Sequence, residues 1–261
     1  MKKVEAVLID LSGTLHIENT ATPNAVEALK RLRASRVKIK FVTNTTKESK
    51  TVLYQRLKKL GFDISQEEIF TSLSAANDLI KKDQLKPMLI VDDAALEDFS
   101  DVSKFDGKPD SVVVGLAPEK FNRPVLNEAL RLLLSGGKLV AIHQGRYYKT
   151  SSGLSLGPGP FVKLLEYAAG VEAVTVGKPN VEFFKAALED LGVADPTTAF
   201  MIGDDVRDDI DGAQRLGLKG CLVQTGKYRS GDETKISPPP DLVLGDFSNA
   251  VDQILSHIGQ S

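Results

Sequence analysis

Short apolar runs alternate along the whole chain with longer segments in which apolar residues recur at helical spacing. The runs predict buried strands, and the segments between them predict helices with one apolar face. Regular alternation of strand and helix predicts a parallel sheet covered by helices on both faces, a doubly wound α/β fold. The predicted strands span residues 6–9, 38–42, 88–91, 111–116, 139–142, 173–176, 199–202, 220–223 and 242–244.

Expected helix boundaries and two stretches that interrupt the alternation of strands and helices add detail to this prediction. Thr22, followed by Pro23, is expected to cap the first helix, and another helix is expected from about Arg207 to Leu216. A charged, Asp-rich stretch and a Gly/Pro-rich loop at 153–160 interrupt the alternation in the middle of the chain. With 261 residues, the chain is expected to form one large domain or two unequal ones.

Composition narrows the class of protein. The chain is 42% hydrophobic and 26% charged, an ordinary globular balance. A formal net charge of -2 gives no electrostatic reason to expect nucleic acid or an anionic membrane as partner. The single cysteine, Cys221, cannot form an internal disulfide, and no apolar run approaches membrane-spanning length. Together with a short, charged N-terminus, these features predict a soluble, cytoplasmic protein.

A first polar cluster follows the first predicted strand, at residues 10–14 (Asp-Leu-Ser-Gly-Thr). Open α/β sheets bind ligands at the carboxyl ends of their strands. A carboxylate at Asp10 could attack an electrophile, and the backbone N–H groups of Gly13 and Thr14 could hold phosphoryl oxygens. Taken alone, the same stretch is explained better by a turn between strand and loop that the Asp side chain stabilises.

Two further clusters lie at predicted strand ends. Thr43 and Asn44 offer hydroxyl and amide donors that suit a phosphate, although the adjacent Thr46 could simply cap the next helix. Lys178 follows the strand at 173–176 and could neutralise a phosphoryl oxygen. Lysines at such positions are more often solvated surface groups, so neither cluster is decisive by itself.

The fourth cluster consists of Gly203, Asp204 and Asp205, with Asp208 and Asp209 shortly after. Adjacent carboxylates repel one another unless a cation compensates them, and Mg²⁺, which prefers oxygen ligands, is the natural compensator. An acidic first turn of a helix would explain Asp208 and Asp209 through the helix dipole. It would explain Asp204, at the strand end, poorly.

The four clusters, in this order, resemble the signatures of the haloacid dehalogenase superfamily: Asp10 in a D-x-x-G-T stretch, Thr43, Lys178, and Gly-Asp-Asp at 203–205. The resemblance spans essentially the whole chain and implies a phosphatase. The long insertion between Thr43 and Lys178 resembles the branch with an α/β cap. It implies a Rossmann-like catalytic core of residues 1–79 and 177–261 and a smaller cap domain of residues 80–176, which closes over the site.

The resemblance also implies roles for individual residues. Asp10 would attack phosphorus and form an aspartyl-phosphate intermediate. Mg²⁺ would bind a carboxylate oxygen of Asp10, the backbone carbonyl of Ser12 and a carboxylate oxygen of Asp204. The phosphoryl group would lie against Ser12, Gly13, Thr43, Asn44 and Lys178, while Asp205 and either Asp208 or Asp209 would orient the metal site from behind.

Ser12 departs from the family pattern. Most phosphatases of this family carry Asp two residues after the nucleophile, as general acid and base. A serine hydroxyl is too weak an acid to replace it, and losing a positioned general acid costs about 10²–10⁴-fold in rate. Either the enzyme acts on substrates with good leaving groups, such as pyrophosphate or phosphoamidates, or it is an impaired relative that binds a ligand or protein. A signalling receiver, a third class, is disfavoured by the late Gly-Asp-Asp and the length.

The implied cap supplies the remaining expectations. The loop at 143–148 (His-Gln-Gly-Arg-Tyr-Tyr) and the loop at 153–160 are candidates to read the leaving group, although packing explains their aromatic residues equally well. His16 and His257 are expected to be structural and Cys221 to be a small buried hydrophobe. The expected partner is a small phosphorylated molecule. A homodimer through the cap is a further expectation.

Overall fold

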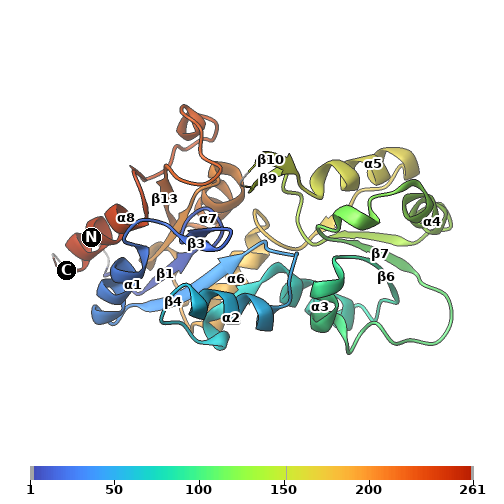
Figure 1. The fold of residues 1–261 in the computed structure, drawn as a ribbon, viewed down its shortest axis with the longest axis horizontal. Coiled ribbons are helices and arrows are strands. Elements are labelled where there is room, and N and C mark those ends of the chain that lie inside the picture. Colours follow the sequence, from blue (N-terminus) through green and yellow to red (C-terminus); the bar gives the residue numbers. More distant parts are fainter. Residues whose placement is uncertain (1–2, 151, 260–261) are drawn as a thin grey trace.

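The computed structural model describes residues 3–150 and 152–259. Its larger sheet has six parallel strands in the order β14-β13-β12-β1-β4-β5 (Figure 1). These strands are β1 (Ala6–Ile9), β4 (Lys38–Thr43), β5 (Ile69–Thr71), β12 (Ala199–Gly203), β13 (Lys219–Val223) and β14 (Leu242–Leu244). β1 lies in the middle, so a residue that follows it sits at the centre of the carboxyl edge.

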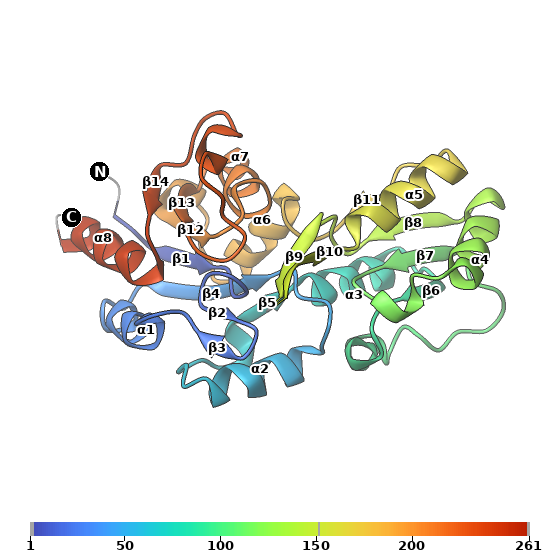
Figure 2. The ribbon, with the colours of Figure 1, turned by 45° about the horizontal axis from the view of Figure 1, so that its top comes forward.

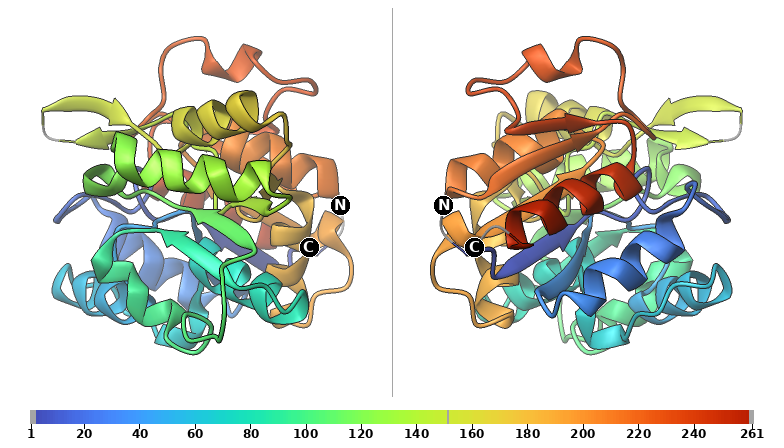
Figure 3. Two further views of the ribbon diagram at one scale, coloured as in Figure 1. Left: turned by 90° about the vertical axis from the view of Figure 1, so that its right-hand side faces the viewer. Right: turned by 90° about the vertical axis from the view of Figure 1, so that its left-hand side faces the viewer.

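Helices cover both faces of this sheet, so every residue of the strands β1 and β12 is buried. α1, α2 and α8 pack on one face, and α6 and α7 on the other. Figure 3 shows α8 lying across the sheet. The helices are α1 (Ala25–Ala34), α2 (Lys50–Lys59), α6 (Val181–Asp190), α7 (Gly212–Leu216) and α8 (Phe247–Gly259). The doubly wound α/β fold predicted from the sequence is therefore confirmed.

A second parallel sheet has the order β11-β8-β7-β6 and lies beyond the carboxyl edge of the first (Figure 1). α4 and α5 pack on one of its faces, and α3 with a 3₁₀ helix at Asp93–Phe99 on the other. The elements are α3 (Ser72–Lys82), β6 (Pro87–Ile90), β7 (Ser111–Val114), α4 (Arg123–Leu134), β8 (Lys138–Ala141), α5 (Gly159–Ala169) and β11 (Val174–Thr175).

Two small hairpins complete the fold. β2 (His16–Ile17) pairs with β3 (Thr20–Ala21) directly after β1, and β9 (Tyr147–Thr150) pairs with β10 (Gly153–Leu156). Figure 2 shows the β9–β10 hairpin between the two sheets. No helix in the described ranges is long and apolar enough to cross a membrane.

The division into domains at residues 79/80 and 176/177 stays a prediction, and the packing adds a relevant fact. α3 runs through position 79/80, and its Leu73, Ala76 and Ile80 belong to the same hydrophobic cluster as Val113 and Val140 of the four-stranded sheet. The buried face of α3 on both sides of position 79/80 therefore packs with the second sheet, while Ala75 of the same helix packs against the core of the first sheet.

One local expectation was wrong. α1 begins at Ala25 after Asn24, and the hydroxyl of Thr22 donates to the carbonyls of Thr14 and Leu15 instead of capping the helix. The helix expected from about 207 to 216 is confirmed, and its first part, Val206–Asp211, is a π-helical turn that leads into α7. In that turn the N–H of Ile210 reaches back to the carbonyl of Asp205.

Candidate active site

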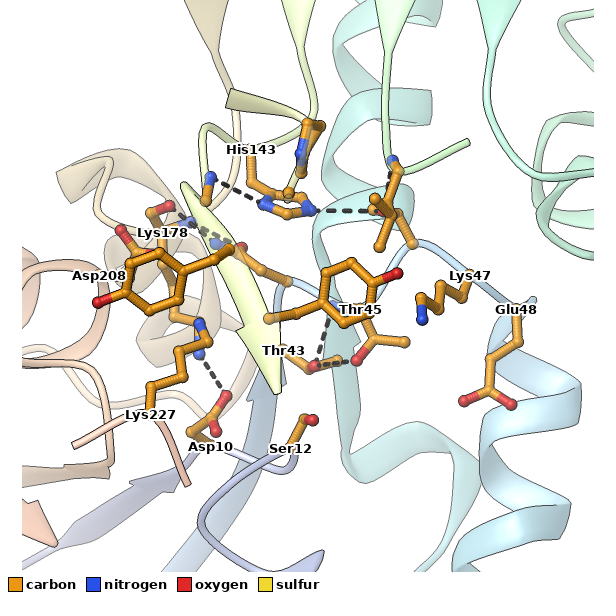
Figure 4. A pocket seen from close by; sticks show the side chains of 18 of the residues that line it. Asp10, Ser12, Thr43, Thr45, Lys47, Glu48, His143, Lys178, Asp208 and Lys227 are labelled. Carbon is orange, nitrogen blue, oxygen red and sulfur yellow. Dashed lines mark hydrogen bonds and ion pairs between the residues drawn. The ribbon is translucent and has the colours of Figure 1, made fainter. Parts of the chain in front are cut away.

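Asp10 and Lys178 form a buried ion pair at the carboxyl edge of the six-stranded sheet (Figure 4). Asp10 directly follows β1. The Nζ of Lys178 lies 2.6 Å from Asp10 Oδ1, 2.6 Å from Asp209 Oδ1 and 3.1 Å from the carbonyl of Val42. Burial alone would lower the pKa of Lys178, but the two carboxylates outweigh it and raise that pKa above its ordinary value. The lysine is therefore held as a cation against Asp10.

Three carboxylates converge at this point. Oxygen atoms of Asp10, Asp204 and Asp209 lie within 4.8 Å of one another, and all three residues are buried. Burial, reinforced by repulsion from Asp10, raises the pKa of Asp204 well above its usual range, and burial raises the pKa of Asp209 to about 6. A hard divalent cation would relieve this repulsion, and carboxylate oxygens are the ligands that Mg²⁺ prefers. The donor set therefore fits the predicted metal.

The loop after β1 passes so close to Asp204 that position 13 has no room for a side chain. Gly13 has φ +102°, and a Cβ there would lie 2.1 Å from Asp204 Oδ2. Its carbonyl accepts a 2.6 Å hydrogen bond from the hydroxyl of Thr225, in the loop after β13. A glycine is thus required for the Asp10 loop to approach Asp204.

Ser12 lies at the mouth of the site, exposed and lining the cavity above Asp10 (Figure 4). The role of Ser12 towards a substrate stays a prediction. Thr14, also in this loop, is buried and donates from its hydroxyl to Asp10 Oδ2 over 3.3 Å. The nucleophile candidate is thus fixed by Thr14 on one oxygen and by Lys178 on the other.

Thr43 and Asn44, at the end of β4, have different surroundings. The Thr43 hydroxyl lines the cavity and exchanges hydrogen bonds with Thr45, through the Thr45 N–H at 3.1 Å and the Thr45 hydroxyl at 3.0 Å. The Asn44 amide donates to the carbonyl of Lys178 and accepts from the N–H of Lys178, at 2.9 and 3.0 Å. The Asn44 side chain therefore holds the Lys178 loop in place.

Asp205 and Asp208 lie at the start of the π-helical turn. Asp205 accepts the N–H groups of Arg207 and Asp208, so it caps this turn, and its own N–H donates to Asp209 Oδ2. Asp208 lines the cavity, and burial followed by repulsion from Asp205 raises its pKa to about 7. Both positions agree with supporting roles around the carboxylate cluster.

Lys227 is a residue of the site that the sequence reasoning missed. Its N–H donates to Asp204 Oδ2 at 2.6 Å, and its Nζ lies 3.3 Å from Asp205 Oδ2. Burial alone would lower its pKa, but the surrounding carboxylates, Asp205 first among them, raise it. Lys227 lies shortly after the strand that ends at Val223, and this position near a strand end is the sequence feature that could have identified it.

A cavity of about 310 Å³ opens above these groups, between the two sheets. Both segments expected as cap loops contribute to its wall, through His143, Tyr147 and Tyr148 and through Pro158. The expectation that 153–160 is a loop was wrong in part, because Gly153–Leu156 forms β10, which pairs with β9, and α5 begins at Gly159. His16, which we expected to be structural, also lines it, whereas Cys221 is buried in β13 as expected.

His143 joins the second sheet to the loop after β4. Its Nδ1 accepts the N–H of Gly145 at 3.2 Å, and its Nε2 lies 3.4 Å from the hydroxyl of Thr46. Burial, followed by the charges of Lys227 and Lys178, lowers its pKa to about 3, so the ring is neutral. Thr46 also accepts the N–H of Leu116, and α2 is capped by Ser49, not by Thr46.

A buried Asp–Lys pair at the centre of a parallel sheet, with clustered carboxylates and a second α/β layer above, defines the class of haloacid dehalogenase-like hydrolases. A family model described as haloacid dehalogenase-like hydrolase matches residues 7–103, and a second HAD-like hydrolase model matches residues 175–250. The protein called haloacid dehalogenase-like hydrolase domain-containing protein 2 of Rattus norvegicus is 61% identical, over 98% of this chain and 97% of its own. The chain belongs to the haloacid dehalogenase-like hydrolases.

Two further proteins are similar over most of their length. The phospholysine phosphohistidine inorganic pyrophosphate phosphatase of Homo sapiens is 40% identical, over 97% of this chain and 95% of its own. Among solved structures, a glycerol phosphate phosphatase from Mycobacterium tuberculosis in complex with magnesium superposes with a TM-score of 0.82 at 27% identity, covering 95% of this chain and 79% of that one.

Proposed function

We propose that this hydrolase is a magnesium-dependent phosphatase that acts through an aspartyl-phosphate at Asp10 on a small phosphorylated molecule, pyrophosphate or a phosphoamidate. The observation that carries the proposal is the 2.6 Å contact between Asp10 and Lys178 at the floor of the cavity. A carboxylate that is held on both oxygens, paired with a lysine and facing a cavity has the properties of a nucleophile. The names of the two similar phosphatases support the same reaction class.

In this reaction Asp10 attacks phosphorus, the bond to the leaving group breaks, and water then releases phosphate from the aspartyl-phosphate. Lys178 offsets the charge of the nucleophile and of the incoming phosphoryl group, which would otherwise repel each other. Thr43 and the Asn44 backbone hold the phosphoryl oxygens during the transfer. The N–H of Gly13, which the sequence offered as a further donor, instead donates to the carbonyl of His16 at 2.7 Å.

Asp10, Asp204 and the backbone carbonyl of Ser12 would hold Mg²⁺, and the closeness of Asp209 to both carboxylates adds a further oxygen to the neighbourhood. The ion, when bound, supplies positive charge that draws a phosphate dianion to a carboxylate site. Asp205 and Asp209 orient the surrounding groups, because Asp209 accepts both the Asp205 N–H and the Lys178 amine.

Ser12 favours a second candidate function, in which the protein binds its ligand and turns it over very little. The two functions separate in one assay. Phosphate release is measured from pyrophosphate, an aryl phosphate and a phosphoamidate, with Mg²⁺ and with a chelator, and Asp10→Asn serves as the control. The proposal expects Mg²⁺-dependent release that Asp10→Asn abolishes. Stabilisation of the wild type by orthophosphate without release from any substrate would favour the binding function instead.

The proposed partner is the small phosphorylated substrate alone. The net charge of -2 gives no support for nucleic acid or an anionic membrane surface. A homodimer through the second sheet and a cytoplasmic location stay predictions.

A further inference from the structure

Four cationic side chains line the cavity: Lys47, Arg56, Lys178 and Lys227. Three of them are paired with carboxylates. Lys178 contacts Asp10 and Asp209, Lys227 contacts Asp205, and Arg56 contacts Glu48 at 2.5 Å. Lys47 differs from these three, because no ion pair to it is found within residues 3–150 and 152–259.

Lys47 rests instead on an aromatic ring of the second layer. Its Nζ lies 3.8 Å from the centre of the Tyr148 ring, in the β9–β10 hairpin. A cation–π contact fixes the ammonium group on one side while leaving other N–H bonds able to donate. Figure 4 shows the amine of Lys47 turned into the cavity and the carboxylate of the adjacent Glu48 pointing elsewhere.

The position of Lys47 relative to the nucleophile defines what it could contact. Asp10, Lys178 and Thr43 form the floor of the cavity, where the transferred phosphoryl group would lie. Lys47 follows Thr43 by four residues and lines the same cavity beside the second layer, where a leaving group would project. An ammonium group there attracts negative charge on the leaving group, and among the residues that the structure describes no carboxylate forms an ion pair with it.

We propose that Lys47, held on the Tyr148 ring, is a specificity-determining residue that binds an anionic leaving group, such as the second phosphate of an inorganic diphosphate. The inference rests on the proposed function and names the substrate class within it. A charged leaving group also agrees with Ser12, because a departing phosphate needs less protonation than an alkoxide does. Lys47 thereby assists departure by charge, in a site that lacks a carboxylic acid at position 12.

The test compares pyrophosphate with p-nitrophenyl phosphate, whose leaving group lacks a second phosphate. The readout is the ratio of the two kcat/KM values in the wild type, Lys47→Met and Lys47→Arg. Loss of a charge-assisted hydrogen bond is expected to lower the ratio by about 10-fold or more in Lys47→Met. Lys47→Arg, which keeps the charge, should recover most of it. Lys59→Met, which removes an exposed lysine of α2, is the matched control and should leave the ratio unchanged.

Binding supplies a second readout. Methylenediphosphonate, a diphosphate analogue whose P–C–P bridge this reaction cannot cleave, should inhibit the wild type more strongly than orthophosphate does, and Lys47→Met should remove that preference. Tyr148→Leu should weaken methylenediphosphonate inhibition, whereas Tyr148→Phe, which keeps the ring, should not.

A ratio within twofold of the wild type in Lys47→Met would overturn this inference while leaving the proposed function intact. Hydrolysis of p-nitrophenyl phosphate or a phosphoamidate but not of pyrophosphate by the wild type would overturn the inference alone. Release of phosphate from none of the three would overturn the proposed function with it.

Discussion

Lys178 Nζ stands 2.6 Å from Asp10 Oδ1, in a place where both side chains are shielded from water. The same amine contacts Asp209, so one cation balances two buried carboxylates. Removing one partner of a buried ion pair leaves the other charge uncompensated. The pair is therefore both part of the proposed chemistry and a condition for stability.

Lys178→Met is expected to abolish turnover and to lower the free energy of unfolding of the metal-free protein by about 3–5 kcal/mol. Urea denaturation with and without a chelator measures the change. Mg²⁺ should restore part of the lost stability, because it offsets the charges of Asp10 and Asp209. If Lys178→Met were as stable as the wild type in the presence of the chelator, the Asp10–Lys178 pair would not contribute to the stability of the fold.

Magnesium should raise the melting temperature of the wild type, because relief of repulsion among Asp10, Asp204 and Asp209 stabilises only the folded state. Asp204→Ala should remove most of this shift. Asp106→Ala, which removes an exposed carboxylate far along the chain, is the control and should keep the shift. If the Mg²⁺-induced shift survived in Asp204→Ala, the metal would bind elsewhere.

Ser12 leads to a prediction about leaving groups. Without a general acid at this position, kcat/KM should fall steeply as the pKa of the leaving group rises, so aryl phosphates should react faster than alkyl phosphates. Ser12→Asp should help alkyl phosphates most, while Ser12→Ala should keep the wild-type dependence. A flat dependence in the wild type, measured over a graded series of phosphate esters, would mean that another group supplies the proton.

His143 makes stability depend on pH. Its pKa is lowered to about 3 by burial, whereas an unfolded histidine titrates near 6.5, so below pH 6.5 the unfolded state binds the extra proton. The stabilisation is complete above pH 6.5 and is lost as the pH falls towards 3, by about 1.4 kcal/mol per pH unit. His16, with a pKa lowered to about 4, adds a similar term.

His143→Gln should therefore reduce the pH dependence below 6.5 by about one proton, and unfolding titrations at several pH values measure it. His257→Gln, at a half-buried position near the end of α8, is the comparison. An unchanged slope in His143→Gln would show that the ring is not held neutral.

The sequence alone was sufficient to predict the parallel sheet and most residues of the candidate site. Apolar runs such as Ala6–Ile9 could only be buried strands, and in a parallel sheet their ends must meet at one edge. Asp10 and Asp204 each follow such a run and Thr43 ends one, so the topology of the six-stranded sheet brings these three together. Lys178 instead follows β11 of the second sheet, and the segment between β11 and α6 brings it to Asp10. The Rossmann-like core is thus a consequence of the pattern.

Other features depend on tertiary contacts that no local pattern reveals. Lys227 belongs to a loop whose path is set by the approach of Gly226 to Asp204, and Thr46 bonds across to Leu116 and His143 instead of capping α2. The π-helical turn arises where Asp209 must turn back to Lys178 and to the Asp205 N–H. In each case a polar group found a distant partner that outweighed its local preference.

The central claim is that Asp10 becomes phosphorylated during turnover. Wild-type protein is mixed with pyrophosphate and Mg²⁺, quenched in acid and treated with borohydride, which reduces an aspartyl-phosphate to homoserine. Peptide mass spectrometry then identifies the residue at position 10. The account predicts homoserine at position 10 in the wild type and none in Asp10→Asn or in samples without substrate. Release of phosphate in the absence of any homoserine at position 10, or its appearance at another aspartate, would contradict the account.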